Sequence, residues 1–179
     1  YDAYAKLLQE IEHPFLLYLA LLLHDVGKAD GHGKHADLGG KLARSAALRL
    51  RLGAADTEAL TSLVKNHLLM ALTSQRRDLD DPQVIQLFAE QVGNLETLKL
   101  LTLLTFVDSM ATSDKLWNGF KDALLWLLYG KTLHLLSGST EFLRAEVKGR
   151  EGLKKQVRAS LSDDFSDDEV TAHFEALPA

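Results

Sequence analysis

Two aspartates that each follow an apolar run have the clearest potential for chemistry in this sequence. The His24-Asp25 pair follows a run from Phe15 to Leu23 that has no charged side chain, and Asp108 ends a second such run. A buried carboxylate is usually hydrogen-bonded, ion-paired or bound to a metal ion. Two carboxylates in matching settings, one of them beside a histidine, therefore predict a shared divalent cation.

A purely structural role could explain the same residues. His24 could satisfy free backbone carbonyls at a helix end, Asp25 could begin a turn, and Lys28 could pair with Asp25 three residues away. Taken singly, His35 and His67 are more simply interpreted as satisfied core histidines. Together with the two aspartates, however, the three histidines form a coherent set of nitrogen and oxygen donors for a cation.

Other polar residues carry weaker signals. The remaining histidines are predicted to be structural or solvated: His13, His32, His134 and His173. Three basic residues could face a substrate, although charged linkers are usually only solvated: Arg76, Arg77 and Lys121.

Helices are expected to position all these residues, because apolar side chains recur three and four positions apart along most of the chain. The expected helices span about 1–11, 14–24, 35–52, 57–69, 82–92, 95–111 and 113–136. Asp56, Asp81 and Asn94 are predicted N-caps. A glycine-rich loop is expected over 27–34 and a polar link over 74–81. No strand pattern is visible, so the sequence predicts an all-α fold.

The chain is expected to form one main domain followed by an extension. Its 179 residues are enough for one domain with a real core. A Ser-Gly-Ser-Thr break at 137–140 separates a predicted domain at 1–137 from a more polar helical extension at 138–179. The extension is expected to contain a helix near 141–161 and a short one beginning at Ser166.

Composition excludes several classes of function. The net charge of −5 gives no electrostatic reason to bind nucleic acid or an anionic membrane. The absence of cysteine excludes disulfides, thiolate zinc sites and cysteine nucleophiles. No apolar run is long enough to span a bilayer and no signal peptide is visible, so a cytoplasmic location is expected.

These motifs resemble the HD superfamily of metal-dependent phosphohydrolases. Its HD pair corresponds to Leu-Leu-His24-Asp25-Val-Gly-Lys28, and its downstream aspartate corresponds to Phe-Val-Asp108. His35 and His67 match the additional histidines of members that hold two metal ions. Segments 66–70, 76–82, 101–105, 117–121 and 169–178 are similar to the HD domain and following linker of the bacterial bifunctional PII uridylyltransferase/uridylyl-removing enzymes.

The resemblance implies a helical HD-domain bundle that removes UMP from a uridylylated tyrosine of the PII protein. It implies a divalent metal, Mg²⁺ or Mn²⁺ in preference to Fe, Zn or Ni. The implied metal ligands and catalytic residues are His24, Asp25, His35, His67 and Asp108, with Lys28 as a further catalytic residue. Glutamine is expected to act through regulatory ACT domains outside this sequence.

One departure from the family pattern leaves alternatives open. The superfamily's first histidine belongs on the helix before the HD pair, and the segment 1–12 contains none. Either that histidine lies upstream of Tyr1 or this member lacks it, since His13 is too close to the HD helix. Two other functions remain: an HD-type nucleotide phosphohydrolase, acting on a deoxynucleoside triphosphate or a guanosine signalling nucleotide, and a non-catalytic regulatory helical module.

Overall fold

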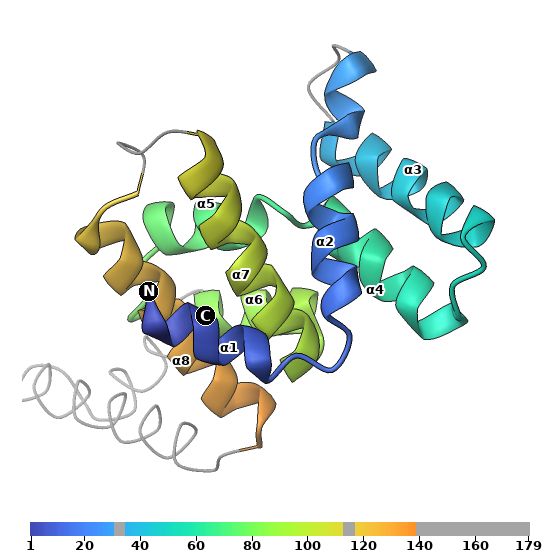
Figure 1. Ribbon diagram of the computed structural model, residues 1–179. Coiled ribbons are helices and arrows are strands. Elements are labelled where there is room, and N and C mark those ends of the chain that lie inside the picture. Colours follow the sequence, from blue (N-terminus) through green and yellow to red (C-terminus); the bar gives the residue numbers. More distant parts are fainter. Residues whose placement is uncertain (31–34, 113–116, 139–179) are drawn as a thin grey trace, which may run out of the picture. The chain divides into compact units, whose positions relative to one another are not determined.

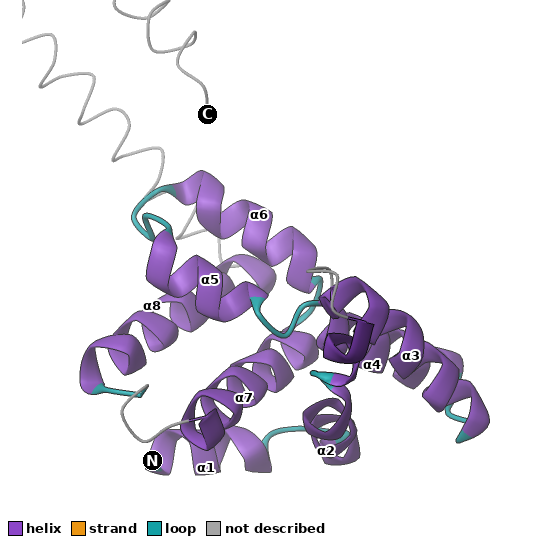
Figure 2. Cartoon of the chain, turned by 90° about the horizontal axis from the view of Figure 1, so that it is seen from above, coloured by secondary structure: helices purple, strands orange, loops and turns teal. Residues whose placement is uncertain are grey.

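A computed structural model describes residues 1–30, 35–112 and 117–138. Within these ranges the chain forms eight α-helices and one short 3₁₀ helix and contains no strand, which confirms the all-α prediction (Figure 2). Residues 1–136 form one compact unit. The helical extension predicted at 138–179 lies outside the described residues beyond Gly138, so it stays a prediction.

The helices follow one another through short connections (Figure 1). They are α1 (Asp2–Gln9), α2 (Pro14–Leu23), the 3₁₀ helix η1 (Val26–Asp30), α3 (His35–Arg49), α4 (Ala54–Lys65), α5 (Leu69–Arg76), α6 (Pro82–Val92), α7 (Leu95–Thr112) and α8 (Gly119–Leu136). None of the helices in the described ranges is both long enough and apolar enough to cross a membrane.

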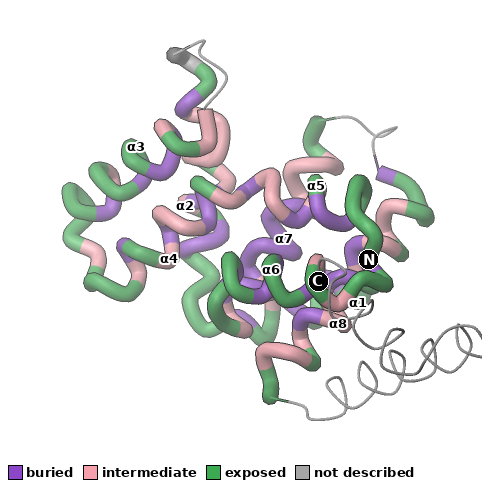
Figure 3. The backbone as a smooth tube through the Cα atoms, turned by 180° about the vertical axis from the view of Figure 1, so that it is seen from behind, coloured by how far each residue is buried: buried purple, intermediate pink, exposed green. Residues whose placement is uncertain are grey.

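The central helix of the unit is α7. It contacts α1, α2, α4, α5, α6 and α8, and Figure 3 shows its largely buried backbone among them. Leu98, Leu101 and Leu104 are at most 1% exposed. A helix that is apolar around most of its circumference is expected in the interior, where neighbours cover every face. Asp108, in its last turns, lies where this buried stretch ends.

The apolar run of α2 is buried on one face only, although a helix without a polar face is expected to be buried on all sides. Leu16, Leu17 and Ala20 are buried on the face that packs against α4 and α7. On the opposite face, Tyr18 is 57% and Leu22 is 76% exposed. An apolar sequence permits burial but does not supply the neighbours, and exposed apolar side chains are common on folded proteins.

Small residues let α3 and α4 approach closely. A β-carbon added at Gly39 would lie 3.2 Å from Val64 Cγ1, and one added at Gly40 would lie 3.1 Å from Lys65 Cβ. Ala43, one turn further along α3, is fully buried. This close packing matters for the site, because His35 begins α3 and His67 directly follows the end of α4.

Several predicted helix boundaries were wrong. The fourth helix begins at Ala54 after Gly53, so Asp56 lies in its first turn and is not its N-cap. That helix ends at Lys65, and a separate helix, α5, covers part of the segment predicted as a polar link. The apolar spacing continues across Asn66–Leu68, so sequence periodicity could not detect this break.

Other local predictions are confirmed or fall outside the described residues. Asp81 accepts a hydrogen bond from the Gln83 backbone N–H at 2.9 Å, and Asn94 accepts one from the Thr97 N–H at 2.8 Å. The expected loop at 27–34 begins as the 3₁₀ helix η1, and its residues 31–34 are not described. The predictions for His32, His173 and the helices beyond 140 also lie outside the described ranges.

Candidate metal centre

The predicted site residues come from separate segments that meet at one end of the helices. His24 caps the C-terminus of α2, and Asp25 follows it directly. Lys28 lies in η1, His35 is the first residue of α3, His67 lies between α4 and α5, and Asp108 is in α7. The 3₁₀ turn of η1 and the sharp break after α4 aim these side chains toward a common region.

The two aspartates face the same histidine nitrogen. His24 Nε2 lies 3.2 Å from Asp108 Oδ1 and 3.4 Å from Asp25 Oδ2. Because these carboxylates come from α7 and from the end of α2, the fold has brought together the two apolar runs that the sequence singled out. One nitrogen and two carboxylate oxygens at this spacing form half of a possible coordination sphere for a divalent ion.

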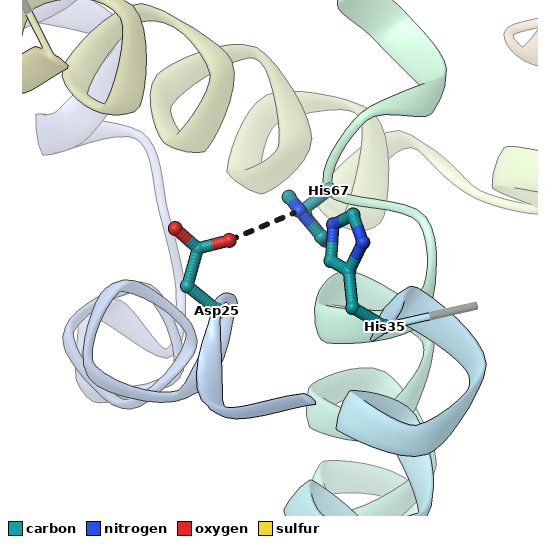
Figure 4. A group of neighbouring side chains, drawn as sticks. All are labelled: Asp25, His35 and His67. Carbon is teal, nitrogen blue, oxygen red and sulfur yellow. Dashed lines mark ion pairs between the residues drawn. The ribbon is translucent and has the colours of Figure 1, made fainter. Parts of the chain in front are cut away.

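Asp25 also faces a second group of donors. Ligand atoms of Asp25, His35 and His67 all lie within 4.8 Å of one another, and Figure 4 shows the two imidazole rings opposite the carboxylate. Asp25 Oδ1 lies 3.8 Å from His67 Nε2, whereas its Oδ2 faces His24. The carboxylate therefore presents one oxygen to His24 and the other to His67.

Backbone carbonyls orient two of the histidines. His24 Nδ1 donates to the Leu21 carbonyl and His67 Nδ1 donates to the Val64 carbonyl, each at 2.8 Å. A proton on Nδ1 leaves the Nε2 lone pair of a neutral ring free to bind a metal ion, and ligating histidines are commonly held in this way. His24 thus satisfies a carbonyl at its helix end, as its structural interpretation predicts, and its Nε2 faces the carboxylates of Asp25 and Asp108.

Unpartnered buried nitrogens indicate that a cation fits here. Among the described residues, Nε2 of His35 and Nε2 of His67 are buried without a hydrogen-bond partner. Buried polar atoms are nearly always paired in folded proteins, so such atoms call for a ligand, ion or water. Two free imidazole nitrogens beside a carboxylate are a donor set that a divalent cation would satisfy.

The ionisation states favour metal binding at neutral pH. Burial acts to raise the pKa of Asp25, but the Lys28 hydrogen bond and the nearby His24 ring outweigh it and hold that pKa below its usual value. Burial lowers the pKa of His67, even though the Val64 carbonyl acts in the opposite direction. Asp25 is therefore ionised and His67 neutral, the forms that coordinate metal ions.

The carboxylates are more accessible than the sequence suggested. The side chain of Asp25 is 40% exposed and that of Asp108 is 30% exposed, whereas His67 is 2% exposed. The assumption that both aspartates are deeply buried was wrong, because each stands at the end of its apolar run. Lys28 Nζ donates to Asp25 Oδ2 at 2.6 Å from the open side. The site is thus buried on the side of His67 and accessible to solvent at its two carboxylates.

Two features complete the comparison with the sequence prediction. His13 pairs with Asp56 at 2.7 Å, away from the centre, as its predicted structural role requires. The hydrogen bond from His24 to a carbonyl at its helix end was expected from the sequence, whereas the one from His67 to the Val64 carbonyl was not. The Val64 carbonyl lies three residues before His67, and the unpaired carbonyls of a helix C-terminus could have indicated this bond.

The helical unit and its histidine–aspartate centre define the class of protein. Residues 3–111 match the family model for the HD domain, and the chain belongs to that family.

The curated relatives are longer proteins. The bifunctional uridylyltransferase/uridylyl-removing enzymes of Nitrosococcus oceani and Azotobacter vinelandii are each 41% identical to this chain, over 89% and 91% of it respectively. The same enzyme of Methylococcus capsulatus is 39% identical over 96% of the chain. The chain spans only 18–20% of the length of these relatives. The comparison with solved structures found no match.

Proposed function

We propose that this HD domain removes UMP from a uridylylated tyrosine of the PII protein. The supporting observation is that Asp25 faces His24 on one side and His67 on the other. This constellation occurs in a chain about 40% identical to enzymes named for uridylyl removal. By the same resemblance, glutamine regulates the reaction through domains outside this sequence.

The reaction is hydrolysis of a phosphodiester. A water oxygen attacks phosphorus, the bond between phosphorus and the tyrosyl oxygen breaks, and UMP and a tyrosine side chain result. The leaving group is a phenol with a pKa of about 10, so it departs with little need of protonation. The site therefore requires little general-acid catalysis, and its principal task is to activate water and neutralise charge on the phosphoryl group.

The proposed ligands divide into two groups that share Asp25. His24, Asp25 and Asp108 would hold one divalent cation, and Asp25, His35 and His67 would hold a second. When bound by these residues, a divalent cation would supply a water of lowered pKa and positive charge to polarise a phosphoryl oxygen. The carboxylates favour Mg²⁺ or Mn²⁺, whereas the histidines also suit Fe, Zn or Ni.

Lys28 is proposed to contact the phosphate. Its side chain is 60% exposed and its ammonium lies on the open side of Asp25. A cation bound to Asp25 would compete with this ion pair, so the ammonium could turn toward an anionic substrate. Positive charge placed where negative charge develops stabilises the transition state of phosphoryl transfer.

The test measures UMP release from uridylylated PII protein by the purified chain with Mn²⁺. A double variant, His24→Ala with Asp25→Asn, is expected to abolish release while circular dichroism shows that the helices persist. The matched control is His13→Ala with Asp56→Asn, because this histidine–aspartate pair at 2.7 Å lies outside the centre. The control should retain the wild-type rate.

Three outcomes would contradict the proposal. Equal release by the site variant and the wild type would show that the centre is not responsible. Hydrolysis of free nucleotides but not of uridylylated PII would favour a nucleotide phosphohydrolase. A helical wild-type chain that binds Mn²⁺ and hydrolyses neither substrate would favour a regulatory module.

A further inference from the structure

Thr105 in α7 has a buried hydroxyl group without a partner. The residue is 2% exposed, and its Oγ1 makes no hydrogen bond within the part of the chain that the structure describes. A helical threonine commonly donates to the carbonyl four residues earlier. Thr102 donates in this way to the Leu98 carbonyl at 2.8 Å. Thr105 makes no such bond, so its hydroxyl is available to another partner.

The position of Thr105 points to the metal centre. The other buried side-chain atoms without partners in the described ranges are Nε2 of His35 and Nε2 of His67, both at that centre. Thr105 lies three residues before Asp108, and residues at this spacing share a helix face with β-carbons about 5–6 Å apart. Asp108 Oδ1 reaches to 3.2 Å from His24 Nε2, so this face of α7 borders the centre.

We propose that Thr105 is a positioning residue whose hydroxyl hydrogen-bonds a water molecule held at the cation site beside Asp108. The inference rests on the site assigned under the proposed function. A buried hydroxyl without a protein partner is accounted for when its partner is an ordered water. Groups that orient the ligands of a cation in this way typically contribute about 10–100-fold to its affinity.

The test compares Mn²⁺ binding by calorimetry and thermal unfolding with and without Mn²⁺. Thr105→Val, which removes the hydroxyl but keeps the branched shape, is expected to weaken Mn²⁺ binding by about 10–100-fold. Its metal-free Tm should be unchanged or higher, because an unpaired buried hydroxyl has been removed. Thr105→Ser keeps the hydroxyl and should restore the affinity.

Thr102→Val is the matched control, because Thr102 is also buried in α7 but its hydroxyl is satisfied. This variant is expected to have a lower metal-free Tm and wild-type Mn²⁺ affinity. Wild-type affinity in Thr105→Val, or an equal loss in Thr102→Val, would overturn the proposal.

These readouts separate the inference from the proposed function. A wild-type chain that binds Mn²⁺, is weakened by Thr105→Val and yet releases no UMP would refute only the hydrolytic function. A wild-type chain that binds no Mn²⁺ would refute the cation site and the role of Thr105 together.

Discussion

Replacing Gly27 with alanine is expected to force apart two segments that hold the candidate centre together. Gly27 lies between the HD pair and α3. An added β-carbon would overlap the carbonyl oxygen of His35 and would lie 2.8 Å from the backbone nitrogen of Gly39. Both neighbours are backbone atoms, so no side-chain rotation can relieve the clash.

The size of the effect follows from these distances. Unstrained contacts of this kind are at least about 3.4 Å, so η1 and the start of α3 must separate by at least about 0.6 Å. Overpacking of this sort costs about 1–3 kcal/mol of unfolding free energy. A shift of this size in His35 also exceeds the tolerance of about 0.2 Å for metal–ligand distances. We therefore expect Mn²⁺ affinity to fall by about tenfold or more.

Urea denaturation followed by circular dichroism measures the free energy, and calorimetry measures Mn²⁺ affinity. Gly119→Ala is the control, because a β-carbon added at Gly119 meets no atom within 4 Å. A Gly27→Ala chain with wild-type stability and affinity would refute the reasoning. A loss of stability alone would show that the contact supports the fold without positioning His35.

Two further predictions concern α8 and α1. Gly130→Ala in α8 should raise the unfolding free energy by about 0.5–1 kcal/mol, because alanine loses less conformational entropy than glycine when a helix forms. The added β-carbon would meet no atom within 4 Å. A lower stability of this variant in urea denaturation would contradict the prediction. Burial and the 2.7 Å hydrogen bond to Asp122 raise the pKa of Tyr4. The folded state therefore keeps this proton while the unfolded state loses it above about pH 10, so stability should fall as pH rises through that value. Denaturation between pH 8 and 11 should show a shallower fall in Tyr4→Phe than in the exposed control Tyr18→Phe.

Predictions from short stretches of sequence were correct where the chemistry of a single residue determines the local structure. The caps at Asp81 and Asn94 were predicted because a carboxylate or amide oxygen there can accept a free backbone N–H. The Asp56 carboxylate could also accept a backbone N–H, but Asp56 lies in the first turn of α4 and pairs with His13 instead. Sequence alone cannot rank a local cap against a partner forty residues away.

By itself, the sequence determined an all-α chain and a set of histidines and aspartates suited to one kind of chemistry. The helical spacing of apolar side chains and the kinds of metal-donor atoms are properties of the residues themselves, so the sequence alone reveals them. Only the tertiary structure decided that α7 is covered on every side while α2 leaves Tyr18 and Leu22 exposed. It alone decided that Asp25 presents one oxygen toward His24 and the other toward His67. The physical reason is that burial and ligand geometry depend on which helices are neighbours. Contacts between segments distant in the sequence determine which helices become neighbours.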